Sequence, residues 1–261
     1  MTAIINELES DLNRVPEVTV DFWLIKVMAV TMGETAADYL AVNLGLGLTT
    51  TSLIMTGVLV VALVLQFAQK RYVPWAYWLA VVLISIVGTL VTDNLVDNFG
   101  VRLETTTIAF SVVLALTFAA WYASERTLSI HTIFTTRREI FYWLAILFTF
   151  SLGTAAGDLV AERFDMGYLA TGLIFGGVIA AITLAWFFLG LNGILAFWLA
   201  YILTRPLGAS FGDLLSQPVE YGGMGFGTTA TSLTFLGCIV VIVLYMTLKK
   251  LIDEDEQALL D

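Results

Sequence analysis

The chain has 261 residues, of which 59% are hydrophobic and only 13% charged, and its mean hydropathy is +0.89. A soluble domain carries about 25% charged residues because its surface faces water, so this composition excludes a water-soluble fold and indicates one embedded in lipid. The net charge of −10 draws on acidic residues before the first apolar stretch and after the last one, which argues against nucleic-acid binding.

Eight apolar stretches follow one another along the chain, each long enough for a helix of about 20 residues that crosses the hydrocarbon core. They are residues 22–41, 49–69, 75–95, 104–123, 140–160, 168–189, 194–214 and 228–249. We therefore predict eight transmembrane helices between an acidic N-terminal segment (1–21) and an acidic C-terminal tail (251–261). Residues 1–21 lack the apolar core of a cleavable signal peptide, so we expect the first span to direct insertion.

One pattern recurs in every second stretch. An aromatic residue followed by Trp opens it: Phe22-Trp23, Tyr77-Trp78, Tyr142-Trp143 and Phe197-Trp198. Ten residues after each Trp stands a glycine: Gly33, Gly88, Gly153 and Gly208. Fifteen residues after each Trp stands an aspartate: Asp38, Asp93, Asp158 and Asp213. Four matches without a shift in spacing indicate four tandem repeats of two helices each.

Two spans per repeat bring every repeat into the membrane in the same direction. We therefore predict an all-α membrane protein of four parallel repeats, related by an axis along the membrane normal and forming a pseudo-fourfold or a two-plus-two bundle. The predicted repeats are residues 22–72, 73–137, 138–192 and 193–250.

On these motifs the chain resembles a bacterial integral membrane family described as four tandem repeats of unknown function, each with two membrane helices and a tryptophan. The resemblance covers roughly residues 15–252 and rests on Trp23, Trp78, Trp143 and Trp198. It supports the predicted architecture, and it carries no activity over to this chain.

The orientation follows from lysine and arginine, which remain on the cytoplasmic side of a membrane. Eight of them lie at the termini or in the connections on one side: Arg14, Lys70, Arg71, Arg126, Arg137, Arg138, Lys249 and Lys250. Only Arg102 and Arg163 lie in the opposite connections. We therefore expect a multi-pass protein of the bacterial inner (plasma) membrane with both termini in the cytoplasm.

Several kinds of site are excluded by what the chain contains. Cys238 is the only cysteine and His131 the only histidine, so disulfides, thiolate metal sites and histidine-rich metal sites cannot form. No phosphate-binding GxxxxGK[ST] loop occurs, and no nucleophile, histidine and acid lie together within the spans. We therefore expect neither an enzyme nor a resident cofactor.

Helix geometry gives the depth of the repeated residues. Trp and Asp of one repeat lie about 22 Å apart along a helix, in a hydrocarbon core about 30 Å thick. We expect the tryptophans to anchor the helices at the cytoplasmic interface, the glycines to allow close packing, and the aspartates to approach the outer boundary. The aspartates have two open interpretations: caps of the following turns, or functional carboxylates.

A stripe of charge at four-residue spacing favours a function. Lys26, Glu34 and Asp38 lie on one row of the first helix, and Arg205 and Asp213 lie on the matching row of the seventh. Charged residues inside membrane spans usually face the bundle interior and mark ion pathways or proton relays. The predicted transport pathway therefore comprises Glu34, the four aspartates, Arg205 and Lys26.

The chemistry of these residues indicates what they could bind. The carboxylates of Glu34, Asp38, Asp93, Asp158 and Asp213 are candidate ligands for an oxygen-seeking cation such as Mg²⁺, Mn²⁺ or Ca²⁺, or for H⁺. The outer connections are also acidic, which would attract cations: Asp97, Glu104, Glu162, Asp165 and Glu220.

The leading interpretation is a transporter or exporter of a small cation, with the lipid bilayer and the cation or a proton as its partners. The alternative is a non-transporting membrane module, meaning a sensor, a scaffold or a subunit of a larger complex. An intramembrane enzyme acting on a lipid is a third interpretation. The sequence leaves oligomerisation open.

Overall fold

A computed structural model of the chain describes residues 12–258, which contain eight long helices and no β-strand. The helices are α2 (Val20–Asp38), α3 (Leu48–Phe67), α4 (Pro74–Asp93), α5 (Leu103–Glu125), α6 (Thr136–Asp158), α7 (Gly167–Leu189), α8 (Gly193–Ser216) and α9 (Thr228–Ala258). The acidic residues expected before position 12 and after position 258 lie outside the described residues. Residues 251–258 extend α9 as helix.

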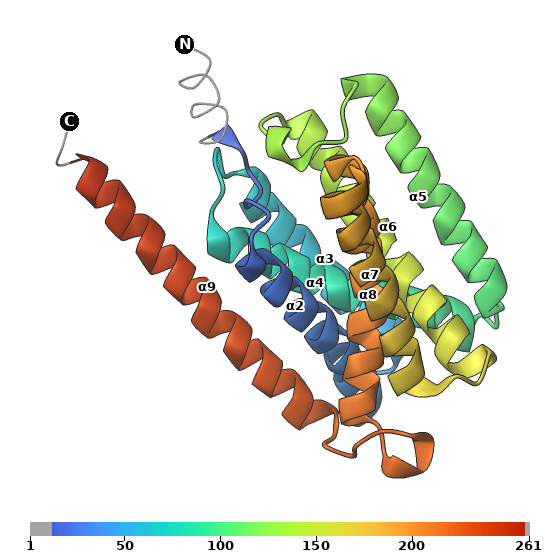
Figure 1. Cartoon of the computed structure of the whole chain (residues 1–261). Helices are drawn as coiled ribbons and strands as arrows, with labels where there is room; N and C mark the ends of the chain where they lie inside the picture. The colour runs from blue at the N-terminus through green and yellow to red at the C-terminus, as the bar shows by residue number, and fades with distance from the viewer. Residues whose placement is uncertain (1–11, 259–261) are drawn as a thin grey trace.

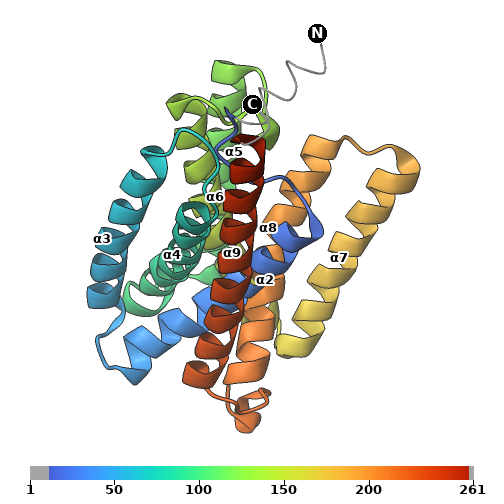
Figure 2. The same cartoon turned by 90° about the vertical axis from the view of Figure 1, so that its left-hand side faces the viewer.

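Four inner helices form the centre of the molecule, and four outer helices surround it (Figures 1 and 2). The inner helices are the first of each repeat, α2, α4, α6 and α8, and neighbours in this order pack together, with α8 returning to α2. Each outer helix packs chiefly on the inner helix of the next repeat: α3 on α4, α5 on α6, α7 on α8, and α9 on α2. Because the last outer helix closes onto the first inner one, the four repeats form a cyclic, pseudo-fourfold bundle.

The distribution of burial is that of a bundle surrounded by lipid. Seven helices within residues 12–258 are long and apolar enough to cross a membrane. In the three outer spans α3, α5 and α7 only 6–17% of the residues are buried, against 56–72% in the inner spans α4, α6 and α8. The eighth helix, α2, carries Lys26, Glu34 and Asp38. Its charges are accommodated inside, since Lys26 is 0% and Glu34 only 6% exposed.

Local sequence signals begin and end these helices. Thr19 caps α2 and Thr135 caps α6, each by accepting a bond from a first-turn amide, and Pro74 opens α4, where its missing N–H is not needed. In repeats 1 to 3 a π-helical turn starts directly after the motif aspartate: Tyr39–Asn43, Asn94–Asn98 and Leu159–Arg163. Such turns are rare and frequently mark functional sites.

The repeat spacing places five sets of four residues, one from each inner helix, at matching positions along the four helices, four residues apart. From the tryptophan end they are Phe22, Tyr77, Tyr142 and Phe197; Lys26, Val81, Ile146 and Tyr201; Val30, Ser85, Phe150 and Arg205; Glu34, Thr89, Thr154 and Ala209; and the four motif aspartates. In the second to fourth sets no residue is more than 6% exposed. The interior of the bundle is therefore packed with side chains along most of its length.

The motif aromatic residues form a closed belt. The aromatic residue before each Trp contacts the Trp of the next repeat: Phe22 and Trp78 at 5.6 Å, Tyr77 and Trp143 at 5.5 Å, Tyr142 and Trp198 at 6.2 Å, and Phe197 and Trp23 at 5.7 Å between ring centroids. Trp78, Trp143 and Trp198 are 1–4% exposed. Neighbouring repeats therefore enclose these three rings, so they pack between helices, where the sequence predicted anchors at the membrane interface.

The motif glycines give the close helix packing expected of them. A Cβ on Gly33 would lie 2.0 Å from the Ser85 hydroxyl, and one on Gly153 would lie 2.3 Å from Arg205. The same contact recurs between Gly88 and Phe150 and between Gly208 and Val30. In every case the partner stands three residues before the glycine of the next repeat, so the prediction of close approach is confirmed four times around the ring.

The topology can be tested by labelling single cysteines in a Cys238→Ser background. The first described residues and the end of α9 lie at one end of the bundle (Figure 1). Phe99, which is 72% exposed, lies in the connection between α4 and α5, and His131 lies in the connection between α5 and α6. Since one helix separates them, the two connections lie at opposite ends of the bundle. We expect an impermeant thiol reagent outside the cell to label Phe99→Cys and not His131→Cys. The reverse pattern would overturn the orientation.

Candidate functional site in the bundle axis

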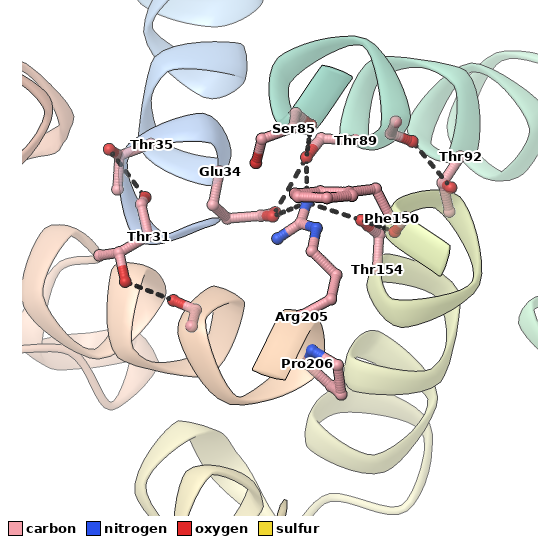
Figure 3. A network of polar contacts seen from close by, with 12 residues as sticks. Thr31, Glu34, Thr35, Ser85, Thr89, Thr92, Phe150, Thr154, Arg205 and Pro206 are labelled. Carbon is pink, nitrogen blue, oxygen red and sulfur yellow. Dashed lines mark hydrogen bonds and ion pairs between the residues drawn. The ribbon is translucent and has the colours of Figure 1, made fainter. Parts of the chain in front are cut away.

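Arg205 occupies the centre of the bundle and contacts all three other inner helices (Figure 3). Its Nη2 donates to Glu34 Oε2 on α2 at 2.7 Å and to Thr154 Oγ1 on α6 at 2.8 Å, and it also contacts Thr89 Oγ1 on α4. Thr89 in turn donates to Glu34 Oε2 at 3.2 Å. One guanidinium therefore joins four repeats through groups that are all buried.

The repeat pattern explains why Arg205 can reach these partners. Glu34, Thr89 and Thr154 each follow the motif glycine of their own repeat, so they stand at one level around the axis. The fourth residue at that level is Ala209, one turn above Arg205 on the same helix. Because the alanine side chain is small, it leaves space at this level for the Arg205 guanidinium.

Glu34 is the only carboxylate in direct contact with Arg205 among the described residues, and the pair is shielded from solvent on both sides. The side chain of Arg205 is 0% and that of Glu34 8% exposed. Arg205 Nε and Nη1 have no hydrogen-bond partner in the described part of the structure, although the guanidinium lies 5.7 Å from the centre of the Phe150 ring. The ion pair is therefore buried, and two of the three guanidinium nitrogens of Arg205 donate no hydrogen bond among the described residues.

Lys26 belongs to the next set toward the tryptophan end and is also fully buried. Its Nζ sits 3.9 Å from the centre of the Phe150 ring and 4.1 Å from that of the Tyr201 ring, without a hydrogen-bond partner among the described residues. Arg205 is close enough to repel it. Cation–π contacts alone hold this amine, and they stabilise a cation less than a paired carboxylate does.

The four motif aspartates lie at the end of the inner helices opposite to the tryptophans. Each is partly exposed, and each interacts electrostatically with its neighbours around the ring: Asp38 with Asp93, Asp93 with Asp158, Asp158 with Asp213, and Asp213 with Asp38. Glu34 lies within electrostatic range of all four. The structure thus places the four predicted aspartates at one end of the axis, each within electrostatic range of its neighbours in the ring.

The capping interpretation of the aspartates receives no support from their hydrogen bonds. Asp38, Asp93 and Asp158 each precede a π-turn, and none makes a side-chain cap bond to it. Among the described residues, Asp38 accepts one long bond, from Gln217 Nε2 at 3.4 Å. Within that part of the chain these carboxylates therefore keep most of their acceptor capacity free.

The sequence also suggested that Glu34 and the aspartates bind a metal ion. Within residues 12–258, no three Asp, Glu, His or Cys side chains lie close enough to hold one metal ion. The exposed Asp97 and Glu162 add further negative charge at the aspartate ring, since both interact electrostatically with Asp38. The structure therefore places the aspartates at one end of the axis without gathering three of them into a metal-ligand cluster among the described residues, and the buried Glu34–Arg205 pair lies beside them.

A second buried charge network, at the tryptophan end, was not predicted from the sequence. Glu139 is 0% exposed, accepts from Arg14 Nη1 at 2.6 Å and from Gln66 Nε2 at 3.1 Å, and accepts from Trp143 Nε1 at 3.3 Å. The N-terminal segment is thereby held against α3 and α6. The only sign of this network in the sequence is that Glu139 and Trp143 lie four residues apart, on one face of a helix.

The chain was compared with known proteins. The family described as Repeat of Unknown Function (DUF347) matches residues 22–72, 76–127, 141–191 and 196–251, and each match contains one inner and one outer helix. No curated protein and no solved structure matches the chain. The four matches cover most of the sequence, and the chain therefore belongs to this family of tandem membrane repeats.

Proposed function

We propose that this multi-pass membrane protein is a carrier of a small cation. Its outer binding site is the aspartate ring, formed by Asp38, Asp93, Asp158 and Asp213, and the Glu34–Arg205 pair closes this site on the inner side. One observation carries the proposal. Four partly exposed carboxylates, three of them at helix ends without a side-chain cap bond and the fourth within α8, lie one helical turn from a buried carboxylate whose partner is a cation. A cation that enters the ring can compete with Arg205 for Glu34. The position of the Arg205 guanidinium would then depend on whether a cation occupies the ring.

The packing of the axis favours a carrier over an open channel. Below the aspartate ring the axis contains Arg205, Phe150 and Lys26, and the aromatic belt closes the end. A groove of about 700 Å³ lies instead on the flank of the bundle, lined by apolar residues such as Ile179, Trp186 and Leu207. A cation could cross only if the helices rearranged, as they do in alternating access.

Flux measurements on purified protein in liposomes test the proposal. We expect wild type to move Mn²⁺, Mg²⁺ or Ca²⁺ down a gradient, and Asp93→Asn to reduce that flux to the leak of protein-free liposomes, because the ring loses charge where the cation binds. Asp21→Asn is the matched control, since Asp21 is exposed in the first turn of α2, at the end of that helix opposite to Asp38. Flux in Asp93→Asn equal to that of the control would remove the ring from the pathway.

The second candidate is a non-transporting membrane module. The packed axis and the lack of a compact metal group within residues 12–258 favour it, because a scaffold needs neither a cavity nor a ligand. Wild-type protein that moves no cation under any imposed gradient would make this module the better conclusion.

A further inference from the structure

The cytoplasmic half of the axis contains a set of buried polar groups that cation binding at the outer ring does not use. Lys26 Nζ and Tyr201 Oη both lack a hydrogen-bond partner within the described residues, and both side chains are 0% exposed. The amine rests directly on the Tyr201 ring, at 4.1 Å from its centre. An unsatisfied buried donor is costly, so two adjacent ones indicate groups that meet a partner in another state.

Two further hydroxyls continue from this point toward the cytoplasm. Tyr77 and Tyr142 hydroxyls lie 2.6 Å apart and are buried from solvent. The Trp198 ring contacts both Tyr142 and Tyr201, at 6.2 and 5.8 Å between ring centroids. The Trp143 ring lies 5.2 Å from that of Tyr142, and its Nε1 donates to Glu139 Oε1 at 3.3 Å. Lys26, three tyrosine hydroxyls and Glu139 therefore follow one another from the middle of the bundle to its cytoplasmic end.

We propose that these residues form a proton relay, with Lys26 as the proton carrier and Tyr201, Tyr142 and Tyr77 as the route to the cytoplasmic end. This inference rests on the proposed cation carrier and names its coupling ion. Lysine suits the role because its amine can lose its proton when buried, whereas a guanidinium cannot. Tyrosine hydroxyls suit the route because each both donates and accepts.

The proton balance along the relay is simple. The Lys26 ammonium gives one proton to the Tyr201 oxygen, directly after a rotamer change or through one bridging water. Tyr201, whose Oη has no hydrogen-bond partner within the described residues, passes its own hydroxyl proton to Tyr142 through a bridging water. The Tyr77–Tyr142 pair passes one on to Glu139 or to cytoplasmic water. Each hydroxyl ends with one proton, and Lys26 ends as a neutral amine. Lys26 is reloaded from the aspartate side after the cation has left Glu34, so that each cycle moves one proton across the membrane.

Arg205 couples the relay to the outer site because it faces both. It is paired to Glu34 at 2.7 Å on the aspartate side and repels Lys26 on the other side, and it shares the Phe150 ring with that lysine. A cation that takes its place at Glu34 moves the guanidinium toward Lys26. Stronger repulsion then expels the lysine proton toward the cytoplasmic end, so that binding of a cation drives movement of a proton.

The relay is tested in liposomes that enclose a pH-sensitive dye, with the membrane potential clamped and a Mn²⁺ gradient imposed. We expect proton movement to accompany Mn²⁺ in wild type. Lys26→Met keeps an apolar side chain of similar length between the two rings and should abolish that movement down to the liposome leak. Tyr201→Phe removes one hydroxyl and should slow the movement without unfolding the bundle.

Two controls separate a relay from a structural role. Lys26→Arg keeps the cation–π contact but cannot release a proton, so it should fail as Lys26→Met does if Lys26 carries protons. Tyr245→Phe removes a hydroxyl from the outer face of α9, where the residue is 62% exposed, and should change nothing. Size-exclusion profiles and thermal unfolding confirm that each variant is folded.

The outcomes distinguish this inference from the proposed function. Mn²⁺ flux without proton movement in wild type, or proton movement at the wild-type rate in Lys26→Arg, would overturn the relay and leave the carrier. Proton movement down an imposed pH gradient without any cation flux, lost in Lys26→Met, would support the relay and overturn the cation carrier. Movement of neither ion would overturn both.

Discussion

Glu34→Gln should destabilise the folded bundle by about 3–5 kcal/mol, the usual effect of removing one partner of a buried ion pair. Glu34 is the one carboxylate in direct contact with the Arg205 guanidinium within residues 12–258, at 2.7 Å, and the Arg205 side chain is 0% exposed. The amide that replaces the carboxylate still accepts a hydrogen bond but offers no charge. Arg205 would then remain as an uncompensated cation inside the membrane. Reversible unfolding in mixed micelles measures the effect.

The double variant Glu34→Gln/Arg205→Met supplies the decisive comparison. It removes both charges, so most of the lost stability should return and the two single effects should be far from additive. Glu104→Gln is the matched control, because Glu104 pairs with Arg102 and Arg163 on the surface at 3.2 Å, and we expect stability close to wild type. Additive single effects would show that Glu34 and Arg205 act separately.

Gly153→Ala should destabilise the bundle by about 1–3 kcal/mol, as other additions to packed cores do. The new methyl group would lie 2.3 Å from Arg205 Cγ and 3.0 Å from Pro206 Cδ. Since Arg205 is anchored at its tip by Glu34 and Thr154, its stem has little room to move. We therefore expect α6 and α8 to separate, with the ion pair strained as a consequence.

The control for this substitution is Gly177→Ala, because a Cβ at Gly177 in α7 meets nothing within 4 Å. Alanine favours helix over glycine, so stability should be unchanged or slightly higher there. Thermal unfolding of the two variants in the same detergent makes the comparison. Equal unfolding temperatures would mean that the inner helices do not depend on the close approach at Gly153.

The sequence alone determined the architecture. Identical spacing of Trp, Gly and Asp in four segments predicts four equivalent two-helix units, because a helix converts equal spacing into equal depth. It also placed Lys26, Glu34 and Arg205 on matching rows, since charge inside a span is stable only when it faces other protein groups. Eight helices, the repeat and the shared interior all follow from these two physical constraints.

The tertiary structure alone decided which groups meet. Arg205 and Glu34 stand 171 residues apart, and only the closure of α8 and α9 onto α2 brings the ends of the ring together. The contacts of Glu139 with Arg14 and Gln66 were missed for the same reason, since these residues also lie far apart in the sequence. The burial of Trp78 was missed for a different one. In a membrane both the lipid-facing and the buried face of a helix are apolar, so hydropathy does not tell them apart and only packing against a neighbouring helix does.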